Sequence, residues 1–203
     1  MSDRLVDVED PMVRSFAPKL LRTIDRAVGY TSEVLAYGQA TEGAPKRRII
    51  ELDELVQDVK DILAIDPAGG IDFIDNVPPG LRIDADSEQL FRVLYNLCRN
   101  SVQALQQASD EDFPDKRLTI AAQRNGQVVS IVIDDNGPGM PQKARENLFS
   151  AFRGSARSGG TGLGLVIARE LVLSHKGTIA LVEKAGLGTQ FRIEIADRAD
   201  LDS

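Results

Sequence analysis

The chain of 203 residues has a single cysteine, a single histidine, no tryptophan and no long apolar run. Cys98 cannot form an internal disulfide, and it has no cysteine partner for a zinc site. It falls in an apolar helical stretch, which favours a small buried core residue. No stretch approaches the ~18 apolar residues of a membrane span, and the N-terminus lacks a hydrophobic signal core. We therefore expect a cytoplasmic protein, with any membrane attachment residing in an upstream sensor outside this sequence.

An excess of positive charge is also missing. The formal net charge is -7, which excludes broad nucleic-acid binding, because that requires a basic surface to neutralise phosphates. Hydrophobic residues make up 42% and charged residues 27% of the chain, as in a globular protein. The length is sufficient for one domain and a smaller element.

The smaller element is predicted at the N-terminus. Asp10 can cap a helix that begins at Pro11, apolar residues then recur at three- and four-residue steps, and Gly38 is a plausible end. A helix of about 27 residues is roughly 40 Å long and cannot bury its apolar stripe on a small domain alone. We therefore predict a helical hairpin over residues 1–42, with its second helix at about 11–38, which forms a homodimer.

A second domain is predicted over residues 47–198, after a linker that contains Gly43 and Pro45. Strands and helices alternate along it, which predicts an α+β sandwich with one mixed sheet and helices on one face. Asn125-Gly126 is a hairpin turn. The predicted strands are 47–51, 71–75, 81–84, 118–124, 128–134, 178–183 and 189–195. The predicted helices are 53–63, with Leu55, Val56, Val59 and Ile62 on its apolar face, and 87–107, 142–149 and 161–174.

Two asparagines on the helix at 87–107 are the first candidate functional residues. Asn96 and Asn100 lie four residues apart and share a helical face. An amide oxygen is a suitable hard ligand for Mg²⁺, which binds few protein groups and keeps phosphates and waters. Considered alone, the pair is more typical of a solvated polar face.

An acidic residue followed by glycines forms the second candidate. Asp135 directly follows the strand predicted at 128–134, and Gly137 and Gly139 come after it. A carboxylate at a strand end can accept a hydrogen bond from an exocyclic amine such as that of adenine, and the glycines allow close approach of a flat ligand. An ordinary strand-to-helix turn has the same composition.

The third candidate is the glycine-rich run at 159–165, which leads directly into a helix. Free backbone N–H groups at a helix N-terminus form an anion site, although a flexible linker before the helix is the alternative. Neither a dinucleotide-binding fingerprint nor a P-loop fits the spacing. A weaker fourth segment, Gly188-Thr189-Gln190-Phe191, begins the last strand.

These segments occur in a diagnostic order. Asn96/Asn100, Asp135-x-Gly137-x-Gly139, Phe149 with Phe152, the run from Gly160 to Leu165, and Gly188-Thr189-x-Phe191 resemble the N, G1, F, G2 and G3 boxes of histidine kinase catalytic domains. The resemblance covers residues 47–196 and implies the Bergerat ATP-binding fold that gyrase-type ATPases share.

The resemblance implies roles for individual residues. Asn100, with Asn96, would hold Mg²⁺, and Asp135 would bind the adenine amine of ATP with Gly139 giving it room. Thr189 would lie in the adenine-side hydrogen-bond network. The remaining cofactor-binding residues would be Gly137 near the adenine and Gly160, Thr161, Gly162, Leu163 and Gly164 around the phosphates.

The resemblance also implies a mobile ATP lid over residues 150–160. Arg153 or Arg157 could neutralise the γ-phosphate there, although a solvated basic loop is as compatible with the sequence. Asn96 stands where related ATPases have a Glu that activates water, so hydrolysis should be slow. Gln103 stands where many members have a Lys, which puts nucleotide affinity in doubt.

The family's phosphoacceptor histidine is not found in this sequence. Residues 11–38 resemble the second helix of the dimerisation and phosphotransfer hairpin, whereas residues 2–9 resemble only the far end of the first. His175, at the end of a predicted helix, is interpreted as structural. We expect that the acceptor precedes Met1, or else lies on another protein, and that this fragment binds ATP without phosphorylating itself.

The sequence therefore predicts the catalytic region of a two-component sensor histidine kinase. It would transfer the γ-phosphoryl of Mg-ATP to a histidine, for relay to an aspartate of a response-regulator receiver domain. Two alternatives are a pseudo-kinase adaptor that docks a response regulator, and a Ser/Thr protein kinase of the same superfold. The intact glycines disfavour the first, and the hairpin-like helix disfavours the second.

Overall fold

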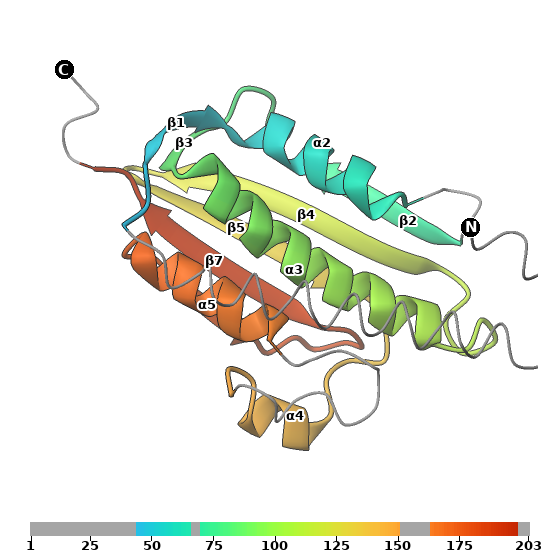
Figure 1. Ribbon diagram of the computed structural model, residues 1–203. Helices are drawn as coiled ribbons and strands as arrows, with labels where there is room; N and C mark the ends of the chain where they lie inside the picture. Colours follow the sequence, from blue (N-terminus) through green and yellow to red (C-terminus); the bar gives the residue numbers. More distant parts are fainter. Residues whose placement is uncertain (1–43, 66–69, 151–162, 199–203) are drawn as a thin grey trace, which may run out of the picture.

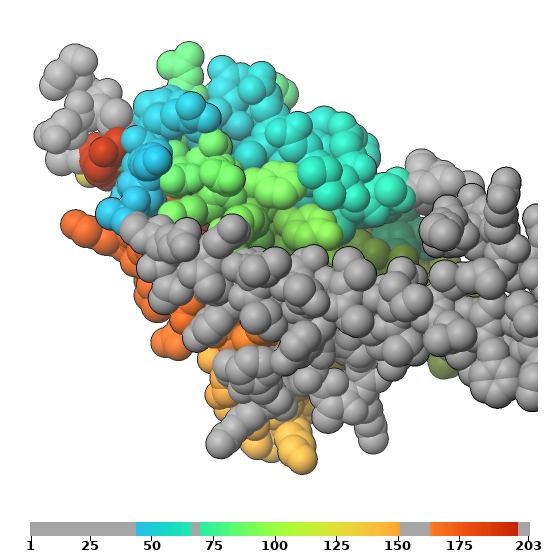
Figure 2. Space-filling view, in the orientation of Figure 1, coloured from blue at the N-terminus to red at the C-terminus, as the bar shows by residue number. Residues whose placement is uncertain are grey.

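The computed structural model describes residues 44–65, 70–150 and 163–198 (Figure 1). The predicted hairpin at 1–42 lies outside these ranges. The described chain forms two layers, with one face of a twisted sheet covered by helices α2 (Leu52–Leu63), α3 (Ser87–Gln107) and α5 (Gly164–Ser174). The short helix α4 (Gln142–Glu146) lies at the edge of the molecule, where it projects in the space-filling view (Figure 2).

The main sheet has five strands in the order β2-β4-β5-β7-β6. β2 is parallel to β4, and the other neighbours are antiparallel, so the predicted mixed sheet with helices on one face is confirmed. The strands are β2 (Ile71–Asn76), β4 (Lys116–Asn125), β5 (Val128–Asp135), β6 (Thr178–Val182) and β7 (Gln190–Ala196).

Alternation of apolar and polar residues explains the centre of this sheet. Every second residue of β7, from Phe191 to Ile195, is buried while the residues between them are exposed. The predicted β4–β5 hairpin is confirmed, since Asn125 pairs with Val128 and Gly126 adopts the positive φ of 61° that its tight turn requires.

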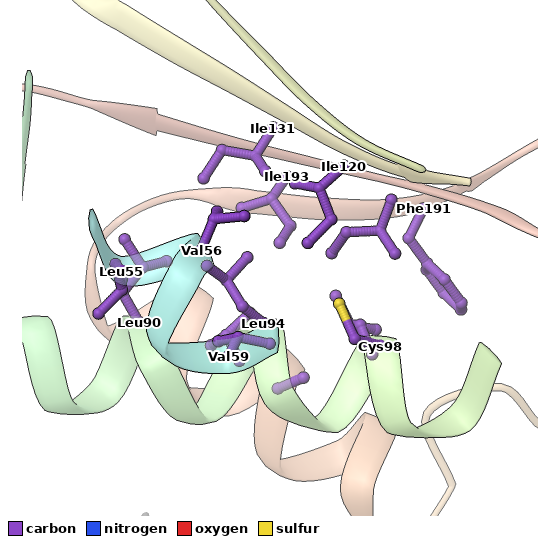
Figure 3. Packing of buried hydrophobic residues seen from close by; sticks show 14 of the residues in the cluster. Leu55, Val56, Val59, Leu90, Leu94, Cys98, Ile120, Ile131, Phe191 and Ile193 are labelled. Carbon is purple, nitrogen blue, oxygen red and sulfur yellow. The ribbon is translucent and has the colours of Figure 1, made fainter. Parts of the chain in front are cut away.

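Helix α3 connects the core to the site. It begins at the N-cap Asp86, whose carboxylate accepts from the backbone N–H groups of Glu88 and Gln89. Its buried face includes Leu90, Leu94 and Cys98, which point toward the sheet (Figure 3). Cys98 is fully buried, as predicted, and burial raises the pKa of its thiol to about 12.

The strands on either side of the Pro78–Gly80 turn belong to different sheets. β3 (Arg82–Ala85) pairs antiparallel with β1 (Arg48–Glu51) in a separate two-stranded sheet, whereas β2 joins the main sheet. The prediction of a single sheet is corrected at this point, because strand partners far apart in sequence cannot be read from local pattern.

Two local predictions are also corrected. Ile62 does not share the buried face of α2, since it is 62% exposed, whereas Leu63 packs against the core. The helical period carries the buried stripe from Val59 to position 63 rather than 62. The helix predicted at 142–149 is shorter, and ends at Glu146.

Candidate functional site

The centre of the candidate site is the carboxylate of Asp135 at the end of β5. The residue is only 2% exposed. Its Oδ2 accepts a hydrogen bond from Ser101 Oγ on α3 at 2.8 Å. Its Oδ1 accepts from the backbone N–H groups of Gly137 and Thr189, each at 3.1 Å. Three segments that are distant in sequence therefore meet at one carboxyl group.

This carboxylate retains capacity for one further donor. An ionised carboxylate offers about four lone-pair positions, and the three hydrogen bonds leave about one of them, on Oδ2. Burial raises the pKa of Asp135, and the bonds from Ser101, Gly137 and Thr189 and the charge of Lys184 only partly oppose that rise. An incoming N–H donor would stabilise the charged form.

Glycines allow the loops around Asp135 to meet backbone to backbone. Gly188 has φ +104°, and a Cβ added to it would lie 1.8 Å from the carbonyl oxygen of Asp135. Gly139 has φ +76°, and a Cβ there would lie 3.1 Å from the carbonyl oxygen of Gly188. The loop after β5 and the connection before β7 therefore need glycine at both contacts.

The two asparagines lie one turn apart on α3, and Asn96 contacts the start of α5. Asn96 is buried, at 9% exposure, and Asn100 is half-buried. An added Cβ on Gly164, the first residue of α5, would lie 3.6 Å from Asn96 Oδ1. The N-terminus of α5 therefore packs beside Asn96, with the fully buried Leu163 as its N-cap residue.

Helix α3 links these two groups of predicted residues. Asn100 directly precedes Ser101, whose hydroxyl binds Asp135, and Asn96 lies one turn earlier. Asp135, Gly137, Gly139 and Thr189 thus form one cluster, and Asn96 on α3 forms a second cluster with Gly164 on α5. Five predicted site residues lie outside the described residues: Arg153, Arg157, Gly160, Thr161 and Gly162.

Comparison with known proteins identifies the family. Residues 85–199 match the family described as histidine kinase-, DNA gyrase B-, and HSP90-like ATPase. The chain belongs to this family. Within it, the chain resembles sensor histidine kinases, being 26% identical over 98% of its length to the sensor-like histidine kinase SenX3 of Mycolicibacterium smegmatis. It is 29% identical over 93% of its length to the sensory histidine kinase/phosphatase NtrB of Escherichia coli O157:H7.

The chain spans about half the length of these curated relatives, 52% of the first and 54% of the second. Among solved structures, the catalytic domain of histidine kinase ThkA superposes with a TM-score of 0.64 at 26% identity, over 75% of this chain and 96% of that one. The structure of ThkA in complex with the response regulator protein TrrA superposes with a TM-score of 0.72 at 24% identity, over 96% of this chain and 55% of that one. At this identity it supports the fold alone. The predicted histidine kinase catalytic domain is confirmed.

Two polar residues of this ATPase domain were missed in the sequence. Ser101 lies among the apolar positions of α3, between Cys98 and Leu105, where a polar side chain signals a buried partner. Lys184 donates to Asp134 Oδ1 at 2.6 Å and to the backbone carbonyl of Asp135 at 2.9 Å. No local pattern predicts this contact, because about 50 residues separate its partners.

The histidine of the ATPase domain is structural, as predicted. His175 is the C-cap residue of α5 and is 2% exposed. Its Nε2 accepts from the backbone N–H of Asp86 at 3.0 Å, so Nδ1 carries the proton and donates to the carbonyl of Leu171 at 2.7 Å. Burial lowers its pKa. Both ring nitrogens are therefore occupied, and neither is free as a nucleophile.

Within residues 44–65, 70–150 and 163–198, no helix is both long enough and apolar enough to cross a membrane.

Proposed function

We propose that this chain is the catalytic region of a two-component sensor histidine kinase, which binds Mg-ATP and transfers its γ-phosphoryl to a histidine elsewhere. The observation that supports this best is the buried carboxylate of Asp135, which has one open acceptor position and lies next to the helix that carries Asn96 and Asn100. The open position is available to a ligand that carries an N–H donor.

Asp135 selects the base in this proposal. Its open position on Oδ2 accepts the exocyclic amine of adenine, while Thr189 and Gly137 hold Oδ1. Guanine presents a carbonyl at the equivalent ring position, so that two acceptors would face each other without a proton. Gly137 and Gly139 keep the backbone free of side chains where the flat base would approach.

Asn100 and Asn96 hold the metal in this proposal. Their amide oxygens are hard, neutral ligands, which fits Mg²⁺ that takes most of its ligands from phosphates and water. When bound, the ion supplies charge neutralisation for the phosphates. The phosphates in this proposal are bound by Gly160, Thr161, Gly162, Leu163 and Gly164. The positive end of the α5 dipole, which begins at Gly164 beside Asn96, adds to their attraction.

The chemistry is transfer rather than hydrolysis. Asn96 cannot act as a general base toward water, so the γ-phosphoryl is retained until a histidine approaches. Arg153 or Arg157 neutralises the γ-phosphate in this account. The acceptor histidine is not in this chain, and residues 1–42 contribute the second helix of the hairpin that forms the homodimer. The phosphoryl group is then passed to a response-regulator receiver domain. ThkA, a histidine kinase of the same fold, forms a complex with the response regulator protein TrrA.

Calorimetric titration of the chain with Mg-ATP tests the binding half of this proposal. We expect saturable 1:1 binding that is lost in Asp135→Asn and reduced when Mg²⁺ is omitted. Absence of ATP binding by the unaltered chain would contradict the proposal and favour an adaptor role.

The transfer half requires the protein with its hairpin complete. Incubation with γ-labelled ATP should give a phosphoryl group that is acid-labile and alkali-stable, as a phosphohistidine is. Label that survives acid would indicate a hydroxyl acceptor and contradict histidine transfer.

A further inference from the structure

The connection between β6 and β7 is tied to the end of β5 by one lysine. Lys184 Nζ forms an ion pair with Asp134 Oδ1 at 2.6 Å, with side-chain exposures of 22% and 33%. The same ammonium donates to the backbone carbonyl of Asp135 at 2.9 Å. Two of its three donors are therefore used on two successive residues of one strand end.

The same connection supplies the groups that orient Asp135. The backbone N–H of Asp135 donates to the carbonyl of Thr189 at 2.9 Å, and the N–H of Thr189 returns a bond to Asp135 Oδ1. Gly188 lies in direct backbone contact with Asp135 between these bonds. Among the side chains of residues 183–189, which the structure describes, Lys184 is thus the one that bonds to this strand end.

An exposed ion pair alone would contribute little to stability. Lys184 differs from such a pair because its side chain is only 22% exposed and because its second acceptor is a main-chain carbonyl beside the buried carboxylate. Its positive charge also opposes the rise that burial causes in the pKa of Asp135. Both effects act on the orientation and charge of the same carboxyl group.

We propose that Lys184 is a positioning residue for adenine recognition. It holds the β6–β7 connection against β5, so that the N–H of Thr189 stays on Oδ1 and Oδ2 remains directed toward the exocyclic amine. The inference rests on the proposed function, because it assigns Lys184 to the same nucleotide site.

The test compares two nucleotides that differ at the recognised group. ADP carries the exocyclic amine, whereas inosine diphosphate carries a carbonyl in its place. Dissociation constants for both, with Mg²⁺, are measured by calorimetry on the full chain and on Lys184→Met, Lys184→Arg and Asp134→Asn. Lys143→Met, at an exposed lysine on α4, is the matched control.

The unaltered chain should prefer ADP. Lys184→Met should weaken ADP binding by roughly tenfold and inosine diphosphate binding by less than about twofold, so that the preference shrinks. Lys184→Arg should restore part of the preference, Asp134→Asn should cause a smaller loss, and Lys143→Met should match the unaltered chain. If Lys184→Met does not fold, judged by thermal melting, the Arg and Asp134→Asn variants decide the question.

Equal weakening of both nucleotides would indicate general destabilisation and would overturn the inference. An unchanged preference for ADP over inosine diphosphate in Lys184→Met would also overturn the inference. If Lys184→Met does not fold, an unchanged preference in both Lys184→Arg and Asp134→Asn would overturn it. Failure of the unaltered chain to bind ADP would instead contradict the proposed function itself.

Discussion

At the residue scale, the buried carboxylate of Asp135 lowers the stability of the fold while it offers an acceptor to a ligand. Its pKa is raised in the folded state, so its contribution to stability is present below the unfolded pKa of about 3.8 and is lost as the pH rises through the folded pKa. Above the folded pKa, the ionised and buried carboxylate therefore costs folding free energy. Binding sites commonly retain such a cost because the ligand relieves it.

Asp135→Asn should change both the stability of the fold and the affinity for nucleotide. The amide keeps the shape and the bonds from Gly137 and Thr189 but removes the buried charge. We expect a higher melting temperature than the unaltered chain at pH 7, no advantage near pH 4, and ADP binding weakened by more than about tenfold. A lower melting temperature at pH 7 would contradict the assignment of a raised pKa.

The contribution of His175 to stability should depend on pH in the opposite direction to that of Asp135. Its pKa is lowered, so its stabilising contribution is present above the unfolded pKa of about 6.5 and is lost as the pH falls through the folded pKa. His175→Ala leaves the N–H of Asp86 without its partner and should cost roughly 2 kcal/mol at pH 7.5. Urea denaturation at pH 7.5 and 5.5 measures this, and the difference between the two proteins should shrink at the lower pH.

At the element scale, the contact between the β6–β7 connection and β5 depends on Gly188. In Gly188→Ala, the new Cβ would overlap the Asp135 carbonyl, and φ +104° is strained for any L side chain. We expect a loss of roughly 2 kcal/mol in unfolding free energy together with weaker ADP binding.

Gly186→Ala is the matched control two residues away. A Cβ there meets no atom within 4 Å, so its stability should change by less than about 0.5 kcal/mol. If the two alanine variants were equally stable, the close packing of this connection on β5 would be contradicted.

Local sequence pattern was sufficient to predict the elements that are formed by residues close together in the chain. The bounds of α3 and the β4–β5 hairpin follow from periodicity and from Asn125-Gly126. The pairing of β3 with β1 was not predictable, because it joins strands more than 30 residues apart through main-chain bonds that leave no residue pattern. Lys184 was missed for the same reason, whereas Ser101 stood in an apolar stripe and could have been found.

At the scale of the whole molecule, the two ends of the described domain are held together far from the nucleotide site. Asp84 is fully buried and accepts from Arg198 Nε at 2.7 Å, and it pairs with Arg47 at 3.2 Å. Arg47 also donates to the carbonyl of His175 at 3.0 Å. This cluster lies at the start of α3, roughly 20 Å along the helix axis from Ser101.

Asp84 should therefore matter for stability and not for binding. Burial alone would raise its pKa, but the bonds from Arg198 and the charge of Arg47 outweigh it, so the pKa is lowered. Its stabilisation is present above the unfolded pKa and is lost as the pH falls through the folded pKa. Asp84→Ala removes the carboxylate that the largely buried Arg47 shares with Arg198, and it should cost roughly 3 kcal/mol in urea denaturation.

Asp58→Ala, at an exposed position of α2, should change the unfolding free energy by less than about 0.5 kcal/mol. The ADP dissociation constant of folded Asp84→Ala should equal that of the unaltered chain. A large loss of affinity would show that the two ends of α3 are coupled.

The central claim is that α3, the end of β5 and the start of α5 form one magnesium-nucleotide site. Backbone amide NMR spectra recorded during titration with Mg-AMPPNP test it most directly. We expect the backbone amide signals of Asn100, Asp135 and Gly164 to shift together with a single dissociation constant, while those of Asp84 and His175 do not shift. Shifts confined to one of the three elements, or dissociation constants that differ among them, would contradict it.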